Sequence, residues 1–179
     1  MVYLGMIQKI VGVKNPVLRE KARDVKKIDK KTLELIRDMQ DTLMQQKDPE
    51  GVGLAAPQIG KSLRIFVVDY KKLKRVIINP IVLETSKTSK SKKVEKDILE
   101  GCLSLPHYYG PIERNQRIKI KYLDEKAKEQ IEEFTDFDAQ IIQHEIDHLN
   151  GILFVDKILE QKAPLYKFDG DEWEEVELI

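Results

Sequence analysis

Apolar residues recur at every third or fourth position between residues 29 and 46, which is the spacing of one α-helix face. These apolar residues are Leu33, Ile36, Met39 and Leu43. Charged residues, Asp38 and Asp41 among them, fall on the other faces. Asp29 is placed to cap the first turn, and the sequence KDPEG at residues 47–51 is typical of a helix end. The pattern predicts a surface helix over about residues 29–46.

Further segments have the composition or the alternation of β-strands. Residues 63–69 (LRIFVVD) and 75–81 (RVIINPI) are rich in β-branched residues and are predicted to be strands, with Pro80 at an edge or a bulge. Residues 117–123 (RIKIKYL) alternate between apolar and mostly basic residues, which indicates a half-buried strand. Residues 130–134 are placed to return beside it as a hairpin partner.

A second helix is predicted between Thr135 and Gly151. Thr135 can cap its start, with Asp138 as a weak capping-box partner, and Gly151 fits the position just after a helix end. Ile141 and Leu149 supply apolar surface along this helix. It carries two of the three histidines of the chain.

The composition is that of a single domain spanning residues 1–179. Of the 179 residues, 41% are hydrophobic and 35% are charged, which suffices for one buried core. Lysine plus arginine equals aspartate plus glutamate at 31 each, so no net field favours DNA or a membrane surface. No apolar run reaches the ~20 residues of a membrane span, and the first ten residues lack the features of a secretion signal. We therefore expect a cytoplasmic protein.

Two segments depart from this balance. Residues 84–97 (ETSKTSKSKKVEKD) are rich in lysine and serine, so they are predicted to form a mobile, solvated excursion. A nucleic-acid patch is the alternative for this segment, although it lacks aromatic residues on which bases could stack. Residues 168–179 form an acidic tail, which is either poorly ordered or a short strand built on Trp173 and Val176.

The segment QHEIDHLNG at residues 143–151 carries the strongest chemical signal. Positions i and i+4 of a helix lie on one face, so His144 and His148 can direct both imidazoles at one metal ion. Glu145 lies about 100° further round the turn, where it could accept a proton from a water held by that metal. An ordinary surface helix with two histidines is the simpler alternative.

Two histidines need at least one further ligand to hold a catalytic metal. The third histidine of the metzincin pattern is absent, because Phe154 occupies its position. A downstream glutamate, as in gluzincins, would have to be Glu172. Cys102 is the only cysteine, and a single cysteine is usually a buried, small apolar residue. A thiolate would nevertheless be a strong, soft ligand, so beside this incomplete pair we favour Cys102 as the third ligand.

Three stretches together resemble one family. GVGLAAPQ at residues 51–58, EGCLS at 100–104 and QHEIDHL at 143–149 match, in order, the three motifs of the peptide deformylases. The resemblance covers roughly residues 7–158. It implies an α+β fold in one domain, with antiparallel β-sheets packed around a central metal-binding helix and with an N-terminal helix.

The resemblance also implies a cofactor and a reaction. An Fe²⁺ ion, replaceable by Zn²⁺, Ni²⁺ or Co²⁺, would be bound through Cys102, His144 and His148. The enzyme would remove the formyl group from the N-terminal formylmethionine of newly synthesised polypeptides. Metal-bound water or hydroxide would attack, with Glu145 as general base and then general acid. The partners would be N-formylmethionyl peptides and nascent chains.

Residues of the substrate site follow from the same resemblance. Gln58 and the backbone N–H of Leu103 would hold the formyl oxygen. Gly53 and Gly101 would let the peptide lie alongside as an added strand. The methionine side chain would enter a pocket lined by Val52, Ile98, Phe137 and Ile141.

Glu100 is the expected partner of a metal-bound histidine, with Arg114 orienting it. The chain departs from the family pattern at Tyr109, where many members have an arginine that helps to hold the substrate backbone. Its acidic tail also differs from the basic C-terminal helix through which some members dock on the ribosome. Transient ribosome contact would therefore fall to the lysine-rich segment at 84–97.

Two other functions remain open alongside the deformylase. A zinc endopeptidase would use the same two histidines with a glutamate as third ligand. A protein that binds metal or nascent chains without catalysis is the other alternative. Metal retention after Cys102→Ala would favour the endopeptidase, and turnover of a formylmethionyl peptide would exclude the non-catalytic protein.

Overall fold

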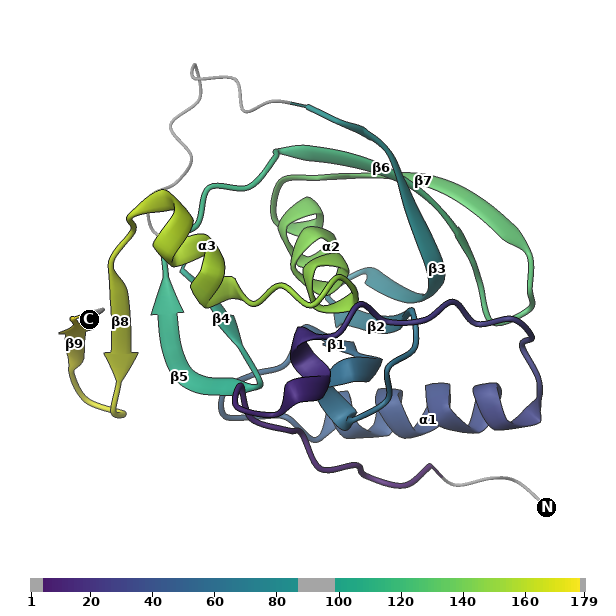
Figure 1. Ribbon diagram of the computed structural model, residues 1–179, viewed down its shortest axis with the longest axis horizontal. Helices are drawn as coiled ribbons and strands as arrows, with labels where there is room; N and C mark the ends of the chain where they lie inside the picture. The colour runs from purple at the N-terminus through teal and green to yellow at the C-terminus, as the bar shows by residue number, and fades with distance from the viewer. Residues whose placement is uncertain (1–4, 87–98, 178–179) are drawn as a thin grey trace.

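The computed structural model describes residues 5–86 and 99–177 of the chain. The helices in these residues are η1 (Pro16–Arg19), α1 (Lys30–Met44), η2 (Ala56–Ile59), α2 (Asp136–Leu149) and α3 (Phe154–Gln161). The strands are β1 (Gly53–Ala55), β2 (Ile65–Tyr70), β3 (Leu73–Thr85), β4 (Glu100–Cys102), β5 (Leu105–Gly110), β6 (Arg117–Leu123), β7 (Glu129–Thr135), β8 (Leu165–Phe168) and β9 (Trp173–Val176). They form two antiparallel sheets, ordered β1-β2-β3-β6-β7 and β4-β5-β8-β9 (Figure 1). The predicted α+β fold with antiparallel sheets is confirmed.

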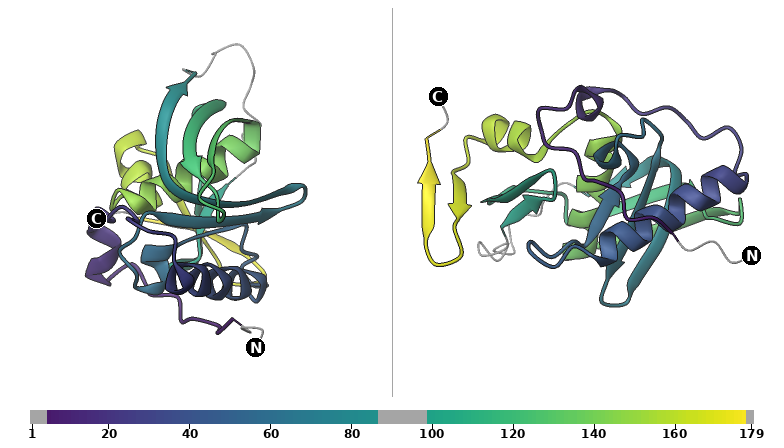
Figure 2. Two further views of the ribbon diagram at one scale, coloured as in Figure 1. Left: turned by 90° about the vertical axis from the view of Figure 1, so that its right-hand side faces the viewer. Right: turned by 90° about the horizontal axis from the view of Figure 1, so that it is seen from below.

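The first sheet has a helix on each face (Figures 1 and 2). On one face Phe66 of β2 belongs to a buried cluster that includes the apolar side of α2. On the other face Val67 of β2 belongs to a cluster that includes Ile36 and Met39 of α1. Because side chains alternate along a strand and both faces are covered, the sequence of β2 is a continuous apolar run.

Helix α2 lies at the centre of the molecule, and strands β3, β6 and β7 curve around it (Figure 1). Ile142 and Leu149 of α2 are fully buried in the same cluster as Ile118 and Ile120 of β6. This packing fixes the helix against the sheet. The opposite side of α2, which carries His144 and His148, is left facing β4 of the second sheet.

The second sheet packs on helix α3. Phe154 and Ile158 of α3 share a buried cluster with Leu165 of β8 and Cys102 of β4. Strands β8 and β9 form the end of the molecule farthest from the first sheet (Figure 1). The acidic tail therefore contains a strand, Trp173–Val176, which is one of the two alternatives that the sequence left open.

Helix α1 begins at the predicted cap, because the side chain of Asp29 accepts a hydrogen bond from the N–H of Thr32. Asp38 was expected on a polar face, but it is buried. Its carboxylate accepts hydrogen bonds from the N–H of Met6 and from the side chain of Gln8. The segment before η1 thus covers a face of α1 that its sequence pattern assigns to solvent.

Strand β3 is longer than predicted and extends to Thr85. Its pairing with β6 shifts register between Ile78 and Ile81, which places Pro80 at the predicted bulge. Residues 84 and 85 therefore belong to a strand, and the predicted excursion at 84–97 was wrong at its start. Residues 87–97 of that segment lie outside the described residues, as does Ile98.

The start of α2 differs from the predicted capping box. Thr135 occupies the cap position, but its side chain makes no capping hydrogen bond. Asp136 adopts a φ of 54°, and its N–H bonds to the carbonyl of Gln116, so the backbone enters the helix along a different path. Gly151 has a φ of 75° directly after the C-cap, as predicted for the helix end.

Among the described residues, no helix is long and apolar enough to cross a membrane.

Candidate metal centre and active site

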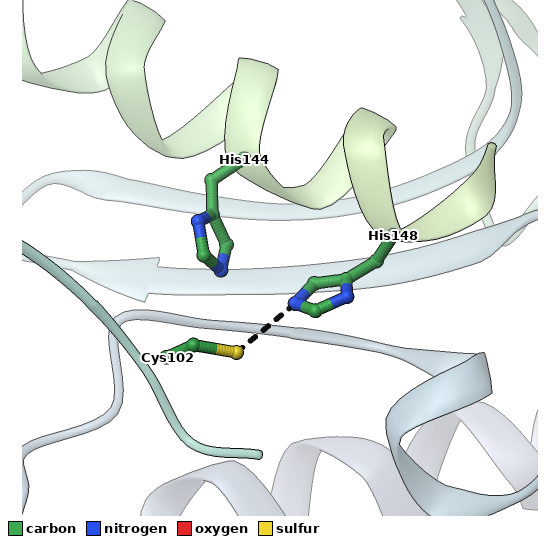
Figure 3. Close-up of side chains that lie close together, drawn as sticks. All are labelled: Cys102, His144 and His148. Atoms are coloured by element: carbon green, nitrogen blue, oxygen red, sulfur yellow. Dashed lines mark hydrogen bonds between the residues drawn. The ribbon is translucent and has the colours of Figure 1, made fainter. Parts of the chain in front are cut away.

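Three side chains from two separate elements converge beside α2. His144 and His148 extend from one side of the helix, and Cys102 approaches them from β4 (Figure 3). One ligand atom from each residue lies within 4.8 Å of the other two. The Sγ atom of Cys102 lies 3.2 Å from Nε2 of His148. A thiolate and two imidazoles at this separation form a set that could hold one metal ion.

A break in strand pairing directs Cys102 toward the helix. Gly101 pairs with Tyr109 of β5, whereas Cys102 pairs with Leu105, so the register shifts between the two residues. Such irregularities turn a side chain away from the direction that a regular strand would give it. Cys102 is buried, and its placement joins two segments about forty residues apart in the sequence.

Glu145 is buried beside the cluster. A Cβ atom on Gly53 would lie 2.3 Å from Oε1 of Glu145, so the absence of a side chain at position 53 makes room for this carboxylate. Its other oxygen, Oε2, is buried and has no hydrogen-bond partner among the described residues. Burial raises the pKa of Glu145 to about 7, against the opposing effect of the two histidines.

A buried ion-pair network holds His144. Oε1 of Glu100 lies 2.7 Å from Nδ1 of His144, which leaves Nε2 of that ring free to face the cluster. Arg114 donates two hydrogen bonds to Glu100, at 2.6 and 2.9 Å, and a third to Asp147 at 2.5 Å. Asp147 was not among the site residues predicted from the sequence. Its position three residues after His144 places both side chains on the same side of α2, and this spacing could have identified it.

The charges of the network shift the pKa values of its members. Burial alone would raise the pKa of Glu100, but His144 and Arg114 outweigh it and lower the value to about 2. Burial would likewise raise the pKa of Cys102, but the two histidines hold it well below its usual range. Burial would lower the pKa of His144, and Glu100 with Cys102 raises it instead. The cysteine is thus favoured as a thiolate.

Gln58 lies on η2 and points its amide into the same site. Its Oε1 atom accepts a hydrogen bond from the N–H of Ala55 at 2.8 Å, which fixes the orientation of the amide. Its Nε2 atom lies 3.5 Å from Sγ of Cys102. The preceding chain holds this arrangement, because the N–H groups of Val11 and Val13 bond to the carbonyls of Gln58 and Ser104.

A cavity of about 180 Å³ opens beside the cluster. Its lining includes most of the residues expected at the substrate site: Val52, Gly53, Gln58, Glu100, Gly101, Cys102, Leu103, Phe137, Ile141, His144 and Glu145. Tyr109, His107 and Gln140 complete the wall on the side of β5 and α2. Arg114 lies behind Glu100, and Ile98 is outside the described residues.

The residues present fit a divalent metal ion. Glu100 engages Nδ1 of His144, and Nε2 of His148 faces the sulfur of Cys102, so both rings direct a nitrogen at the same region. A carboxylate held to the outer nitrogen of a ring is the usual support for a metal-bound histidine. Oε2 of Glu145, which is buried without a hydrogen-bond partner in the described part of the chain, adds a polar group suited to a water at the same place.

The fold and the site together define a class: an α+β protein whose buried Cys–His–His cluster could hold a metal ion beside a carboxylate and an apolar-walled cavity. The chain matches the family model described as polypeptide deformylase over residues 7–164.

Known proteins of that description resemble the chain over most of its length. A peptide deformylase from Pseudothermotoga lettingae is 44% identical over 154 residues, which cover 86% of this chain and 84% of the relative. Peptide deformylase 1 from Clostridium acetobutylicum is 46% identical over 157 residues, which cover 88% of this chain and 98% of the relative. Among solved structures, the crystal structure of peptide deformylase from Thermotoga maritima matches this chain with a TM-score of 0.76 and 38% sequence identity. The match covers 84% of this chain and 97% of that chain.

The chain therefore belongs to the polypeptide deformylase family, whose members are enzymes that remove the formyl group from an N-terminal methionine.

Proposed function

We propose that this chain hydrolyses the formyl amide at the N-terminal formylmethionine of newly synthesised polypeptides, in the cytoplasm, using one divalent metal ion. The family match supports the reaction class. The observation that carries the proposal is the position of Glu145, which is buried beside the Cys–His–His cluster with one oxygen unpartnered among the described residues.

Cys102, His144 and His148 would hold the metal. A metal held there would lower the pKa of a water molecule and polarise a carbonyl oxygen. We propose Fe²⁺ as the ion, with Zn²⁺, Ni²⁺ or Co²⁺ as replacements, because a thiolate with two imidazoles suits these borderline and soft ions. Glu100, held by Arg114, would keep the ring of His144 oriented toward the metal.

Glu145 would carry the proton during the reaction. It accepts a proton from the attacking water as the new bond forms between the water oxygen and the formyl carbon. It then gives that proton to the nitrogen of methionine as the bond between carbon and nitrogen breaks. The products are a free amino terminus and formic acid, which keeps the second hydrogen of the water until it ionises to formate at neutral pH. The raised pKa of Glu145 suits a group that must both accept and release a proton.

Gln58 and Leu103 would stabilise the charge that develops on the formyl oxygen. The side-chain amide of Gln58 is fixed by the N–H of Ala55, so its NH₂ group is already directed at the site. The backbone N–H of Leu103 would donate the second hydrogen bond. Removing one such donor costs about 3 kcal/mol of transition-state stabilisation in comparable sites.

The substrate would bind as an extended strand between the two sheets. Strands β1 and β4 each stand at the end of a sheet, and Gly53 of β1 and Gly101 of β4 line one cavity. A peptide inserted there could pair with both exposed edges. The methionine side chain would then contact Val52, Phe137 and Ile141 in the apolar part of the cavity.

The proposal is tested by formate release from formyl-Met-Ala-Ser, with acetyl-Met-Ala-Ser as the matched control. Enzyme prepared with Fe²⁺ without oxygen should release formate from the first peptide, because thiolate-bound iron is prone to oxidation in air. Cys102→Ala should lose both metal and activity. Cleavage of internal peptide bonds, with metal retained in Cys102→Ala, would instead support an endopeptidase and contradict the proposal.

A further inference from the structure

The second sheet has one apolar face that α3 covers and one aromatic face. Leu165 and Val176, which pair across β8 and β9, lie in the cluster under α3. Because side chains alternate along a strand, the neighbouring positions point to the opposite face. Tyr109 pairs with Tyr166, and Phe168 pairs with Trp173, so these rings share that opposite face.

Trp173 contacts two of the other rings on this face, those of Tyr109 and Phe168. The ring centroids of Tyr109 and Trp173 lie 5.4 Å apart at an interplanar angle of 68°, which is an edge-to-face arrangement. Those of Phe168 and Trp173 lie 4.8 Å apart. Trp173, the only tryptophan of the chain, remains 52% exposed. We call Tyr109, Phe168 and Trp173 the aromatic platform.

The aromatic platform is continuous with the cavity at the metal centre. Tyr109 lines that cavity, and its ring lies over Gly101, where a Cβ atom would come within 2.7 Å of two ring atoms. Gly101 belongs to β4, the end strand of the second sheet (Figure 1). The missing side chain at position 101 therefore lets the ring of Tyr109 extend toward the edge along which the substrate would lie.

Strand geometry indicates which substrate residue would meet this ring. Glu100 faces α2, as its contact with His144 shows, whereas a Cβ atom on the neighbouring Gly101 would meet the ring of Tyr109, so Gly101 faces the other way. A methionine side chain directed at Phe137 and Ile141 would lie on the α2 side. In an extended peptide the next side chain points to the opposite side, which is the side of Tyr109.

We propose that Tyr109 determines specificity for the second residue of the substrate, favouring an aromatic or large apolar side chain, and that Trp173 is the positioning residue that holds its ring. This inference rests on the proposed deformylation. An aromatic pair of this kind changes an equilibrium or a rate by about two- to tenfold. The C-terminal hairpin of β8 and β9 would thus contribute to substrate selection.

The test compares two peptides of identical composition, formyl-Met-Phe-Ser-amide and formyl-Met-Ser-Phe-amide, with the nickel-loaded enzyme. The wild type should favour the first peptide in kcat/KM by about three- to tenfold. Tyr109→Ala and Trp173→Ala should abolish the preference by slowing only the first peptide, and Trp173→Phe should retain it. Ile131→Ala, at an exposed apolar position of β7 in the first sheet, should change neither rate.

Trp173 provides a readout that does not depend on turnover. Titration with the product peptide Met-Phe-Ser-amide should change its fluorescence, whereas Met-Ser-Phe-amide should change it less at equal occupancy. Equal kcat/KM for the two formyl peptides, or a preference that survives Tyr109→Ala, would overturn the inference while leaving the deformylase function intact. If the enzyme hydrolyses neither formyl peptide, the proposed function itself is contradicted. In that case the fluorescence titration still tests the inference, and an unchanged fluorescence would overturn it.

Discussion

Gly53 and Glu145 lie next to each other in the wall of the active-site cavity. The carboxylate of Glu145 occupies space that a side chain at position 53 would fill. A Cβ atom there would lie 2.3 Å from Oε1 and 2.8 Å from Cδ of Glu145. Gly53→Ala should therefore displace the carboxylate while leaving Cys102, His144 and His148 untouched. We expect metal content to be retained and kcat to fall about 100-fold, as for other small displacements of a catalytic group.

Gly12→Ala is the matched control for this substitution. The nearest atom to a Cβ on Gly12 is the carbonyl oxygen of Ser104 at 3.9 Å, which is ordinary contact. Both variants should be assayed for formate release and for bound metal. Full activity in Gly53→Ala would show that the carboxylate does not depend on this contact.

The sequence predicted the parts of the fold whose pattern is local. The strict alternation of residues 117–123 matches β6 in full, and Asp29 caps α1 where its side chain predicts. The i, i+4 spacing of His144 and His148 predicted that both side chains extend from one face of a helix, as they do (Figure 3). These features succeed because each depends only on neighbours within a few residues.

Features that depend on distant partners escaped the pattern. Asp38 is buried because the segment around Met6 and Gln8 folds over α1, which no periodicity within the helix reveals. Val82 and Leu83 of β3 lie beyond the predicted strand end at residue 81 and are 43% and 44% exposed. They continue an apolar run without the alternation of a half-buried strand, so the sequence did not reveal that β3 extends to Thr85. The hydrogen bond that joins Asp147 to Glu100's network comes from Arg114, which lies on another segment of the chain.

Glu100 supports the ring of His144, so its removal should weaken metal binding more than it disturbs the fold. Glu100→Gln keeps the size of the side chain but loses the negative charge that faces Nδ1 of His144. Metal affinity, measured by competition with a chelator, should fall about 10- to 100-fold. Glu132→Gln, which also removes a carboxylate paired with an arginine, should leave metal affinity unchanged.

Arg114 neutralises the buried carboxylate of Glu100 and the partly buried carboxylate of Asp147, and its loss should destabilise the protein strongly. Its side chain is 9% exposed, and those of Glu100 and Asp147 are 5% and 16% exposed. Arg114→Met would remove the cation from Asp147 and leave Glu100 with His144 as its charged partner, which should cost about 3–5 kcal/mol in urea unfolding. Arg117→Met breaks a surface pair whose side chains are 47% and 42% exposed, and it should cost less than about 1 kcal/mol. Equal losses would contradict this account of the network.

Glu132 should make part of the stability of the first sheet dependent on pH. Burial raises the pKa of Glu132, but hydrogen bonds from Arg75 and Tyr122 outweigh it and lower the pKa below its usual value of 4.5. Since the folded-state pKa is depressed, the stabilisation is present above about pH 4.5 and is lost as the pH falls through the folded value. The difference in unfolding free energy between wild type and Glu132→Gln should therefore shrink below that pH. A constant difference would show that Glu132 does not titrate in this way.

In the proposed reaction Glu145 moves the proton and does not hold the metal. Glu145→Gln preserves the shape of the side chain but cannot accept the proton, so the most direct measurement is formate release by this variant at known metal content. We expect one metal per chain, as in the wild type, with kcat lowered by about 10²- to 10⁴-fold. Wild-type turnover by Glu145→Gln with its metal bound would show that Glu145 is not the group that moves the proton.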